Sequence, residues 1–407
     1  MKYPLMKAYG IELEYMVVNI NTLNVMPLVP ELFEKINGSF TNEIEHLHIT
    51  WSNELVCHVI ELKNDKPVDD LKKLNLEFQN EIKLINKELL SFGAMLLPTA
   101  MHPFMSPHWE TKLWPHENNE IYSSYDRIFE CKGHGWSNLQ SMHINLAFSN
   151  DQEFEKLHAA VRLILPLIPA LSSSSPIYEN NQGTHLSSRL SFYLENQRRI
   201  PSILGSAIPE QAWSKAEYEK IILEPMYKDI APLDTLNVLQ EEWLNSRAAI
   251  PKFERDSIEI RLCDTNENSF IDLSIAIFWT KVINSLIKEE WISLSEQKMF
   301  SEVDLKEILV STVKQGPKAL ISDEIYLDLW EFDEPTDAQN VLLQIFESLK
   351  YDKDEIQYAA PIQFILKHGT LSERILKACK KDFSTENLVK VYKKISECLE
   401  KVKYFEV

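Results

Sequence analysis

Glycine is scarce in this sequence, and the glycine-rich loops that hold phosphate groups in many nucleotide-binding proteins are missing. The chain has 9 glycines in 407 residues, far below the average of about 7%. It has no GxxxxGK[ST], no GxGxxG after a strand and no GxSxG, which excludes the P-loop, the dinucleotide-binding turn and the nucleophile elbow. A nucleotide, if one binds, must be held by metal ions and arginines.

Positive charge, paired cysteines and long apolar runs are also in short supply. The formal net charge of -19 disfavours nucleic acid or an anionic membrane as a partner, because both need a basic footprint. The five cysteines are widely spaced without a CxxC, which is typical of reduced thiols and implies no zinc site. The longest apolar run, residues 163–171, contains two prolines. We therefore expect a soluble, cytoplasmic protein.

Strands and helices are predicted along the whole chain, and no linker or repeat divides it. Apolar residues spaced by three or four predict a helix at residues 69–92. A capping Asp151 predicts a helix at residues 151–168, and an apolar helix is expected at residues 270–287. Short apolar or alternating runs predict strands at residues 27–30, 94–97, 141–146 and 258–262. After residue 301 the pattern indicates short helices only, including residues 337–349 and 386–402.

The segment Tyr9 to Tyr15 predicts a strand with two carboxylates on one face. Because side chains alternate along a strand, Ile11 and Leu13 can enter a core while Glu12 and Glu14 emerge together on the other side. Glutamate is a poor strand former, and neighbouring carboxylates repel each other. The pair therefore needs bulk water or a cation, and a solvated face is the simpler interpretation of this segment alone.

The same pattern recurs in three further predicted strands. Polar residues flanked by aliphatic ones of opposite parity are Glu61, the pair His143 and Asn145, and the pair Glu259 and Arg261. Glu54 lies seven residues before Glu61, so both can face one side only if a bulge intervenes or if Glu54 precedes the strand. If these segments lie in one sheet, they predict a sheet with one dry face and one polar face.

The polar face would combine carboxylates, an imidazole and a guanidinium. Mg²⁺ prefers oxygen ligands, and carboxylates together with nucleotide phosphates supply them; Mn²⁺ would fit too. Two such ions would clamp a phosphoryl group during transfer, and Arg261 would meet the charge that develops on it. Taken alone, Arg261 fits a structural ion pair better than a phosphate contact. Taken alone, His143 fits a hydrogen-bonded strand histidine better than a metal ligand.

Two glycines stand close together at Gly133 and Gly135, in a chain that has few. A glycine allows the backbone to turn sharply or to come close to another group. We expect this loop to turn sharply or to approach a ligand.

Six motifs in this order resemble the glutamate-cysteine ligases of the carboxylate-amine ligase type, which are related to glutamine synthetase. They are Gly10-Ile11-Glu12-Leu13-Glu14, the pair Glu54 and Glu61, His102-Pro103-Phe104, Ser141-Met142-His143-Ile144-Asn145, the run from Ser175-Pro176 to Arg189, and Ile258-Glu259-Ile260-Arg261-Leu262-Cys263-Asp264. The resemblance spans residues 9–287, with a fainter match around residues 365–374.

The resemblance implies an α+β fold with a glutamine-synthetase-like catalytic domain over residues 1–300. It implies a curved, mainly antiparallel sheet backed by helices in that domain, and a helical C-terminal extension over residues 301–407. It implies that ATP phosphorylates a carboxylate, usually the γ-carboxylate of glutamate, and that an amine such as cysteine, as in glutathione biosynthesis, displaces the phosphate. By position, one metal would have the ligands Glu14, Glu54 and Glu61, and the ATP-side metal would have the ligands Glu12, His143 and Glu259. Arg189 and Arg261 would contact the substrate carboxylate or the transferred phosphate.

The sequence departs from the family where a substrate would be recognised. Asn145 stands where a second histidine is usual, Ser174 replaces an asparagine, and residues 184–188 lack the usual aromatic pattern. Two other functions remain open: a phosphagen-kinase-like phosphotransferase, and a non-catalytic sensor of amino acids or nucleotides. The second substrate, an amino acid or another amine, and the oligomeric state, a homo-oligomer included, are also left open.

Overall fold

The core of the molecule is an eight-stranded antiparallel sheet. The computed structural model describes residues 2–407. The strands lie in the order β2-β3-β4-β1-β6-β10-β9, and β5 pairs with the far end of β1. Their bounds are β1 Tyr9–Asn19, β2 Glu43–His46, β3 Ile49–Asn53, β4 Val59–Asn64, β5 Ala94–Leu97, β6 Ser141–Ala147, β9 Ala249–Lys252 and β10 Ser257–Asp264. The predicted α+β class and antiparallel sheet are confirmed.

Strand β1 organises the sheet because it pairs with three other strands, β4, β5 and β6. The alternation predicted for it is present: Ile11, Leu13 and Tyr15 are fully buried in the main hydrophobic core, and the neighbouring glutamates point to the other face. The predicted strand continues further than expected, to Asn19, since Met16, Val17 and Val18 are also buried.

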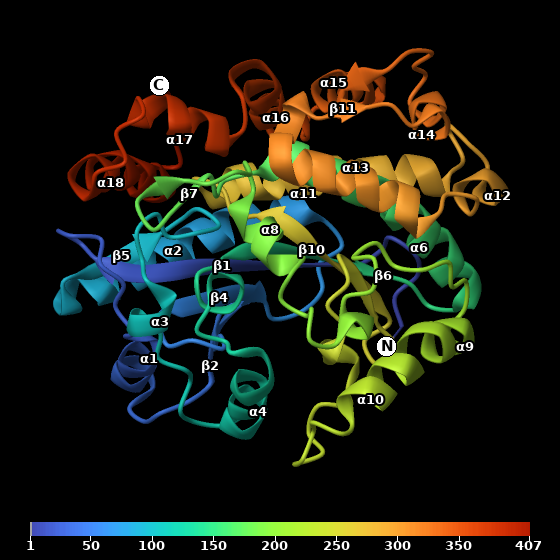
Figure 1. Ribbon diagram of the computed structural model, residues 1–407. Helices are drawn as coiled ribbons and strands as arrows, with labels where there is room; N and C mark the ends of the chain where they lie inside the picture. Colours follow the sequence, from blue (N-terminus) through green and yellow to red (C-terminus); the bar gives the residue numbers. More distant parts are fainter. Residues whose placement is uncertain (1) are drawn as a thin grey trace.

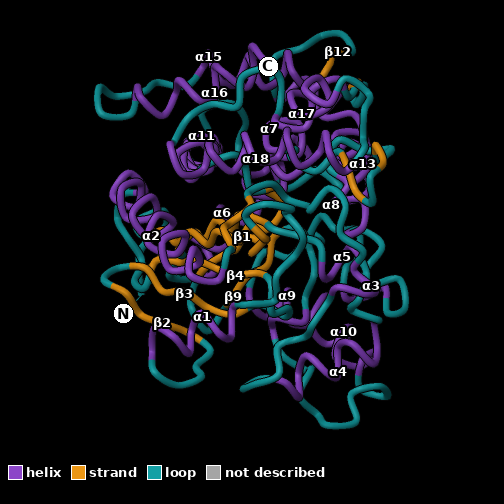
Figure 2. The backbone as a smooth tube through the Cα atoms, turned by 90° about the vertical axis from the view of Figure 1, so that its left-hand side faces the viewer, coloured by secondary structure: helices purple, strands orange, loops and turns teal. Residues whose placement is uncertain are grey.

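Three long helices, α2 (Leu74–Leu89), α6 (Asp151–Ile164) and α11 (Ser269–Ile287), cover the dry face of the sheet. Figure 1 shows α11 above β1, whereas α4 (Asn119–Phe129) and α10 (Glu224–Ile230) lie below it. Figure 2 shows the same separation from the side. The dry face is therefore closed by helices, and the polar face opens toward α4 and α10.

Helix α11 has the length and composition of a membrane span, with 19 residues and a mean hydropathy of 1.5. However, 72% of that window is buried inside the protein, and it packs against α2 and α6. A buried core helix passes the same test of length and composition, so the span is weak evidence for a membrane.

The strand predicted at residues 27–30 is wrong. Helix α1 (Val29–Asn37) begins there, and Pro30 lies in its first turn, where a missing N–H costs no hydrogen bond. The other elements before residue 250 are α3 Pro107–Glu110, α5 His134–Ser137, α7 Ile168–Ser172, β7 Ile177–Tyr178, β8 Asn181–Gln182, α8 Ser188–Tyr193 and α9 Lys215–Tyr218.

The C-terminal region is helical, as predicted. Its elements are α12 Leu294–Gln297, α13 Glu302–Gln315, β11 Leu320–Ile321, α14 Glu324–Leu329, β12 Thr336–Asp337, α15 Ala338–Ser348, α16 Ile356–His368, α17 Leu371–Cys379 and α18 Thr385–Lys401. One hydrophobic cluster extends from Met6 to Leu399, and a second cluster contains most of the buried apolar residues of α17 and α18. The domain division at residue 300 stays a prediction, because packing alone does not define a folding unit.

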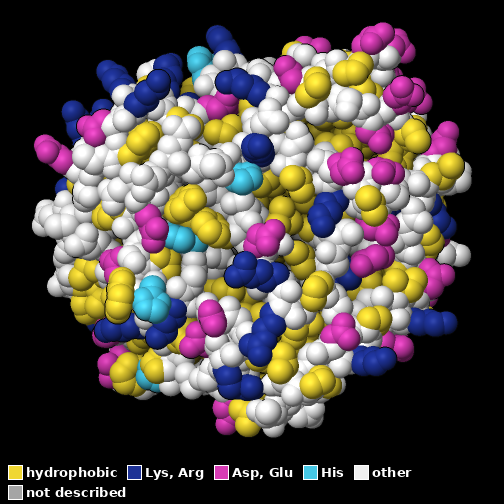
Figure 3. Space-filling view, in the orientation of Figure 1, with side chains coloured by type: hydrophobic (Ala, Val, Ile, Leu, Met, Phe, Trp, Pro, Cys, Tyr) yellow, Lys and Arg dark blue, Asp and Glu magenta, His cyan; other side chains and the backbone are white. Residues whose placement is uncertain are grey.

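The negative net charge is not spread evenly over the surface. Figure 3 shows lysines and arginines gathered at the upper left, over α17 and α18, and acidic side chains at the upper right, over the region of α14 and α15. Helix α18 carries Lys390, Lys393 and Lys394. The C-terminal helices therefore carry local charge of both signs.

Candidate functional site

The predicted carboxylates of β1 lie at the centre of the polar face, between β4 and β6. Glu12 stands opposite His143 of β6 and opposite Lys63 of β4. Glu14 stands opposite Glu61 of β4. Directly opposite residues on one face of a sheet have Cβ atoms about 4.5–5.5 Å apart, so this register alone brings these side chains together.

His143 connects the two carboxylates of β1. Its Nδ1 donates to Glu12 Oε2 at 2.8 Å, and its Nε2 lies 3.0 Å from Ser141 Oγ. Burial alone would lower the pKa of His143, but the hydrogen bond with Glu12 and the charge of Glu259 outweigh it and raise the pKa. Burial would likewise raise the pKa of Glu12, and His143 reverses this and lowers it.

Glu14 is held by the start of strand β6. The backbone N–H of Ser141 donates to Glu14 Oε2 at 2.7 Å, and the Ser141 hydroxyl donates to the same oxygen at 3.1 Å. Burial nevertheless raises the pKa of Glu14, with the charge of Glu61 adding to it. Glu61 accepts from Ser52 Oγ at 2.7 Å and pairs with Lys63 Nζ at 3.1 Å.

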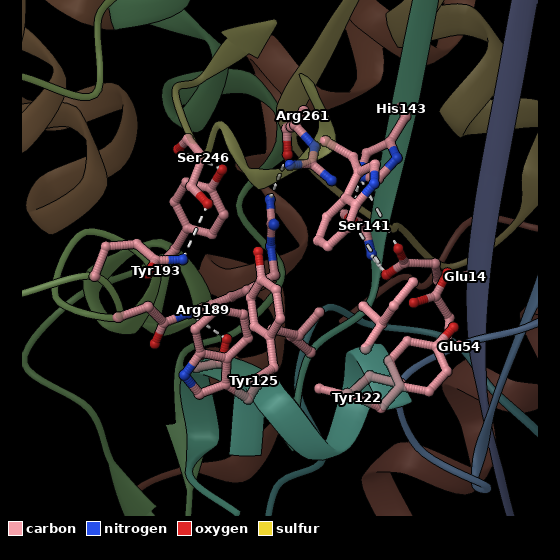
Figure 4. A pocket seen from close by; sticks show the side chains of 18 of the residues that line it. Glu14, Glu54, Tyr122, Tyr125, Ser141, His143, Arg189, Tyr193, Ser246 and Arg261 are labelled. Atoms are coloured by element: carbon pink, nitrogen blue, oxygen red, sulfur yellow. Dashed lines mark hydrogen bonds and ion pairs between the residues drawn. The ribbon is translucent and has the colours of Figure 1, made fainter. Parts of the chain in front are cut away.

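Glu54 lies in the loop between β3 and β4, so the alternative in which it precedes the strand is confirmed. Burial raises the pKa of Glu54 well above its usual value, and the charges of Glu14 and Glu61 add to the effect. Figure 4 shows Glu54 beside Glu14, close to Tyr122. A cation between these carboxylates would relieve their repulsion.

Strand β10 supplies Glu259 and Arg261, and the β10–β6 register shifts between Ile260 and Cys263. Glu259 is 1% exposed and is paired with two cations: Arg261, at 3.1 Å between Nε and Oε1, and Lys252 of β9. The ion pair that the sequence left open for Arg261 is therefore present. Arg261 also lines the cavity described below.

Arg189 of α8 reaches the site with its guanidinium partly occupied. Its Nε donates to Asp264 Oδ1 at 2.6 Å, and its Nη2 donates to the carbonyl of Leu262 at 2.8 Å. Within residues 2–407, Nη1 makes no hydrogen bond, and Arg189 lines the same cavity as Arg261. A substrate contact by Arg189 stays a prediction, and Nη1 is the atom left for it.

The predicted metal ligands form two groups that share His143. One group is Glu12, His143 and Glu259, and the other is Glu14, Glu61 and His143; in each group the ligand atoms lie within 4.8 Å of one another. Each group supplies two carboxylates, whose oxygens are the ligands that Mg²⁺ and Mn²⁺ prefer. Glu54 lies outside both groups, so its role as a ligand stays a prediction.

Two cavities share residues with these groups: Glu14 and His143 line one, and Glu12 lines the other. The first, of about 510 Å³, is lined by Glu14, Glu54, His143, Arg189 and Arg261 together with aromatic side chains. The second, of about 460 Å³, is lined by Glu12, Lys63, Asn145, Arg255 and residues of β2. Both lie within the size range of ligand pockets, about 300–1,000 Å³. Each cavity is therefore large enough for a ligand, and each is lined by a carboxylate of β1.

Two residues that depart from the family pattern, Asn145 and Ser174, form hydrogen bonds within the protein. Asn145 donates from Nδ2 to Glu12 Oε1 at 3.0 Å, so it orients a carboxylate. Ser174 is fully buried, and its hydroxyl donates to the carbonyl of Thr265 at 2.7 Å. A Cβ on Gly135 would collide with the side chain of Asn196. The backbone here comes close to a side chain of the protein, and the approach to a ligand that the glycine pair suggested stays a prediction.

Sequence reasoning missed several side chains of the site. Lys63 follows Glu61 by two residues on β4 and could have been found by strand parity. Lys252 of β9 and the aromatic residues of the first cavity come from separate segments without a shared spacing. No sequence signal pointed to them.

The protein has an α+β fold with carboxylates on one face of an antiparallel sheet. Comparisons with known proteins identify its family. The chain belongs to the glutamate-cysteine ligase family 2 (GCS2), whose family model matches residues 8–394. An uncharacterized protein of Archaeoglobus fulgidus is 31% identical over 94% of this chain and 96% of its own length. Family membership makes the chain a carboxylate-amine ligase.

Relatives with a functional name match more weakly. A protein of Bradyrhizobium sp. strain BTAi1, provisionally named glutamate-cysteine ligase 2, is 26% identical over 63% of this chain and 56% of its own length. The crystal structure of the glutamate-cysteine ligase of Francisella tularensis in complex with AMP matches with a TM-score of 0.61 and 14% identity, over 100% of this chain and 90% of that one. The structural likeness shows the shared fold.

Proposed function

We propose that this chain is an ATP- and Mg²⁺-dependent ligase that forms a γ-glutamyl amide through an acyl phosphate. Family membership supplies the class, and one structural observation supports the mechanism: two ligand groups share His143, and their members line two different cavities. Divalent cations in these groups would neutralise the phosphate charge and clamp the transferred phosphoryl group. A two-substrate reaction needs such a meeting point.

The nucleotide is assigned to the cavity lined by Glu12. The resemblance gives Glu12, His143 and Glu259 as ligands on the ATP side, and Glu12 lines the second cavity. Lys63 and Arg255 line it too, and they are cations of the kind that pair with phosphate oxygens. The carboxylate substrate then occupies the first cavity, beside Glu14.

The reaction proceeds in two balanced steps. An oxygen of the substrate carboxylate attacks the γ-phosphorus of ATP, and the bond from that phosphorus to the ADP oxygen breaks. The amine nitrogen then attacks the carbonyl carbon; the bond to phosphate breaks, and the amine loses one proton. Arg261 faces the transferring group and meets the charge that builds on its oxygens.

Glutamate is the proposed carboxylate. Arg189 Nη1 and Arg261 offer two cationic contacts in the first cavity, one for an α-carboxylate and one for phosphate, while Glu14 and Glu54 can receive an α-ammonium group. Cysteine is the first amine to test because the family carries its name. A cytoplasmic location also stays a prediction.

Hydroxylamine trapping tests the proposal without knowledge of the amine. The enzyme with ATP, Mg²⁺ and glutamate is expected to release ADP and to form γ-glutamyl hydroxamate, detected by mass spectrometry. A phosphagen-type kinase would instead phosphorylate a guanidino compound and form no hydroxamate. ADP release with another acid but never with glutamate would refute the substrate while leaving the ligase class standing.

A further inference from the structure

The first cavity has a wall that the proposed reaction of glutamate does not use. Five of its lining side chains are aromatic, and together they form the aromatic wall: Tyr122, Tyr125, Trp136, Tyr193 and Trp243. They come from α4, α5, α8 and the segment before β9. The second cavity contains only two aromatic lining residues within residues 2–407, Tyr3 and Tyr9. The aromatic surface is therefore concentrated where the acid and amine are expected to meet.

The aromatic wall is already packed in this structure. The Tyr125 ring lies 5.5 Å from Trp136 at an interplanar angle of 78°, and 5.8 Å from Trp243. The ring centroid of Phe129, on α4, lies 5.7 Å from that of Trp136, on α5. Aromatic rings held at these distances and angles stabilise one another. The wall therefore offers a pre-formed surface.

The hydroxyls of two of the three tyrosines, Tyr122 and Tyr193, are turned to the protein. Asn53 Nδ2 donates to the Tyr122 hydroxyl at 3.1 Å, and the Tyr193 hydroxyl donates to the carbonyl of Ser246 at 2.7 Å. Burial raises the pKa of Tyr122 to about 12, so its ring is neutral at physiological pH. What these two tyrosines offer a ligand is ring surface.

Glutamate and cysteine have little apolar surface to place against such a wall. Glutamate is occupied at both ends by charged groups, and cysteine adds one methylene and a thiol. An aromatic group, by contrast, buries about 150–250 Å², and apolar area removed from water contributes about 25 cal/mol per Å². The cavity of about 510 Å³ leaves room for it.

The geometry points to an amine substrate that carries a large apolar group, best an aromatic one, in place of cysteine. This inference rests on the proposed function, because it assigns the amine half of that reaction. The amine nitrogen attacks the carbonyl carbon of γ-glutamyl phosphate, a C–N bond forms, the C–O bond to phosphate breaks with its electron pair, and one N–H proton passes to solvent. The aromatic wall holds the group beyond the nitrogen.

Competing amines test the inference. The full chain is incubated with ATP, Mg²⁺ and glutamate, and 2-phenylethylamine, cysteine or methylamine is added in turn. Formation of each γ-glutamyl amide is followed by mass spectrometry and ADP release. We expect kcat/KM for 2-phenylethylamine to exceed that for cysteine at least tenfold. An equal or higher value for cysteine overturns the inference.

A variant at the rim of the first cavity tests whether the apolar group of the amine lies against the aromatic wall. Trp243 is 38% exposed, so Trp243→Ala removes part of the aromatic wall with little effect on the core. We expect KM for 2-phenylethylamine to rise at least tenfold while KM for ATP stays within twofold. The matched control Trp109→Ala, 82% exposed on α3 and outside the cavity, should change neither. A rise in KM for ATP in Trp243→Ala would mean that the wall holds adenine, which overturns the inference.

Binding without turnover separates this inference from the proposed function. Calorimetric titration of 2-phenylethylamine is expected to show binding to the wild type and to Trp109→Ala, and at least tenfold weaker binding to Trp243→Ala. Binding together with absent hydroxamate formation refutes the γ-glutamyl reaction and supports the aromatic-wall site. Hydroxamate formation without binding or coupling of 2-phenylethylamine refutes the amine assignment and leaves the ligase standing.

Discussion

The guanidinium of Arg189 and the carboxylate of Asp264 form a fully buried ion pair, with 2.6 Å between Nε and Oδ1. Asp264 also accepts hydrogen bonds from the backbone N–H of Ser174 at 2.9 Å and from the hydroxyls of Ser175 and Ser187. One carboxylate at the end of β10 therefore fixes both α8 and the serine-rich segment before β7. Arg189 reaches the first cavity because Asp264 holds its other edge.

Asp264→Asn is expected to lower the free energy of unfolding by about 3–5 kcal/mol, because it leaves the Arg189 charge buried without its partner. Urea denaturation of the purified variant measures the change. The control is Glu397→Gln, which removes one partner of the exposed pair Lys401–Glu397 and should cost less than about 1 kcal/mol. Equal losses in the two variants would contradict a structural role for Asp264.

Glu259→Gln is expected to fold and to lose ATP turnover, because it removes one anionic ligand without leaving a cavity. The Mg²⁺ concentration for half-maximal activity should rise at least about 10-fold, the lower range of losses seen for residues that only support a metal site. Mn²⁺ titration followed by electron paramagnetic resonance measures binding directly. The control Glu81→Gln alters another buried glutamate, one that binds Trp51 and His46 away from the cavities. Unchanged Mn²⁺ affinity in Glu259→Gln would rule out the ligand assignment.

Arg261→Lys is expected to lower kcat far more than it raises KM for ATP. Lysine keeps the charge but loses the planar pair of donors that matches a transferring phosphate, and positioned arginines in phosphoryl transfer contribute about 10³–10⁵ in rate. Initial rates at varied ATP separate the two parameters. The exposed Arg127 of α4, changed to lysine, is the control. A near-normal kcat would leave Arg261 with its ion pair to Glu259 as its only role.

The alternation of side chains explains why much of the site was predictable from sequence. Glu12, Glu14, Glu61, His143 and Glu259 each lie in a strand whose other face is apolar, so the face of each side chain followed from local pattern alone. The alternation did not predict which strands are neighbours in the sheet. The Glu12–His143 contact depends on β1 pairing with β6, over a separation of 131 residues in sequence.

The remaining features depend on tertiary packing. The motif around Arg189 predicted a substrate contact, but its main partner, Asp264, lies 75 residues further along the chain. Tyr125 and Trp136 meet across the turn between α4 and α5, and Trp243 joins them from a distant loop. No periodicity connects these positions. An aromatic wall of this kind becomes visible only when the fold brings the rings together.

His102 gives a prediction about acid stability. It is fully buried; its Nε2 donates to the carbonyl of Leu23 at 2.7 Å, while its Nδ1 accepts from the backbone N–H of Met105 at 2.9 Å. Burial lowers the pKa of His102 to about 4, whereas an unfolded chain has a histidine pKa of about 6.5. Well above pH 6.5, His102 is neutral in both the folded and the unfolded state, and its contribution to the free energy of unfolding is complete.

Between pH 6.5 and 4, His102 binds a proton in the unfolded state but not in the folded state. The free energy of unfolding therefore falls as the pH falls. The loss assigned to His102 should approach roughly 3 kcal/mol, at about 1.4 kcal/mol for each unit of pKa. We would measure urea unfolding of the wild type and of His102→Gln at pH 7.5, 6.5, 5.5 and 4.5. The difference between the two proteins isolates the contribution of His102, because all other groups titrate in both. The wild type should be more stable at pH 7.5, and the difference should shrink as the pH falls. A difference that stays constant with pH would show that His102 accepts a proton as readily in the folded protein as in the unfolded chain.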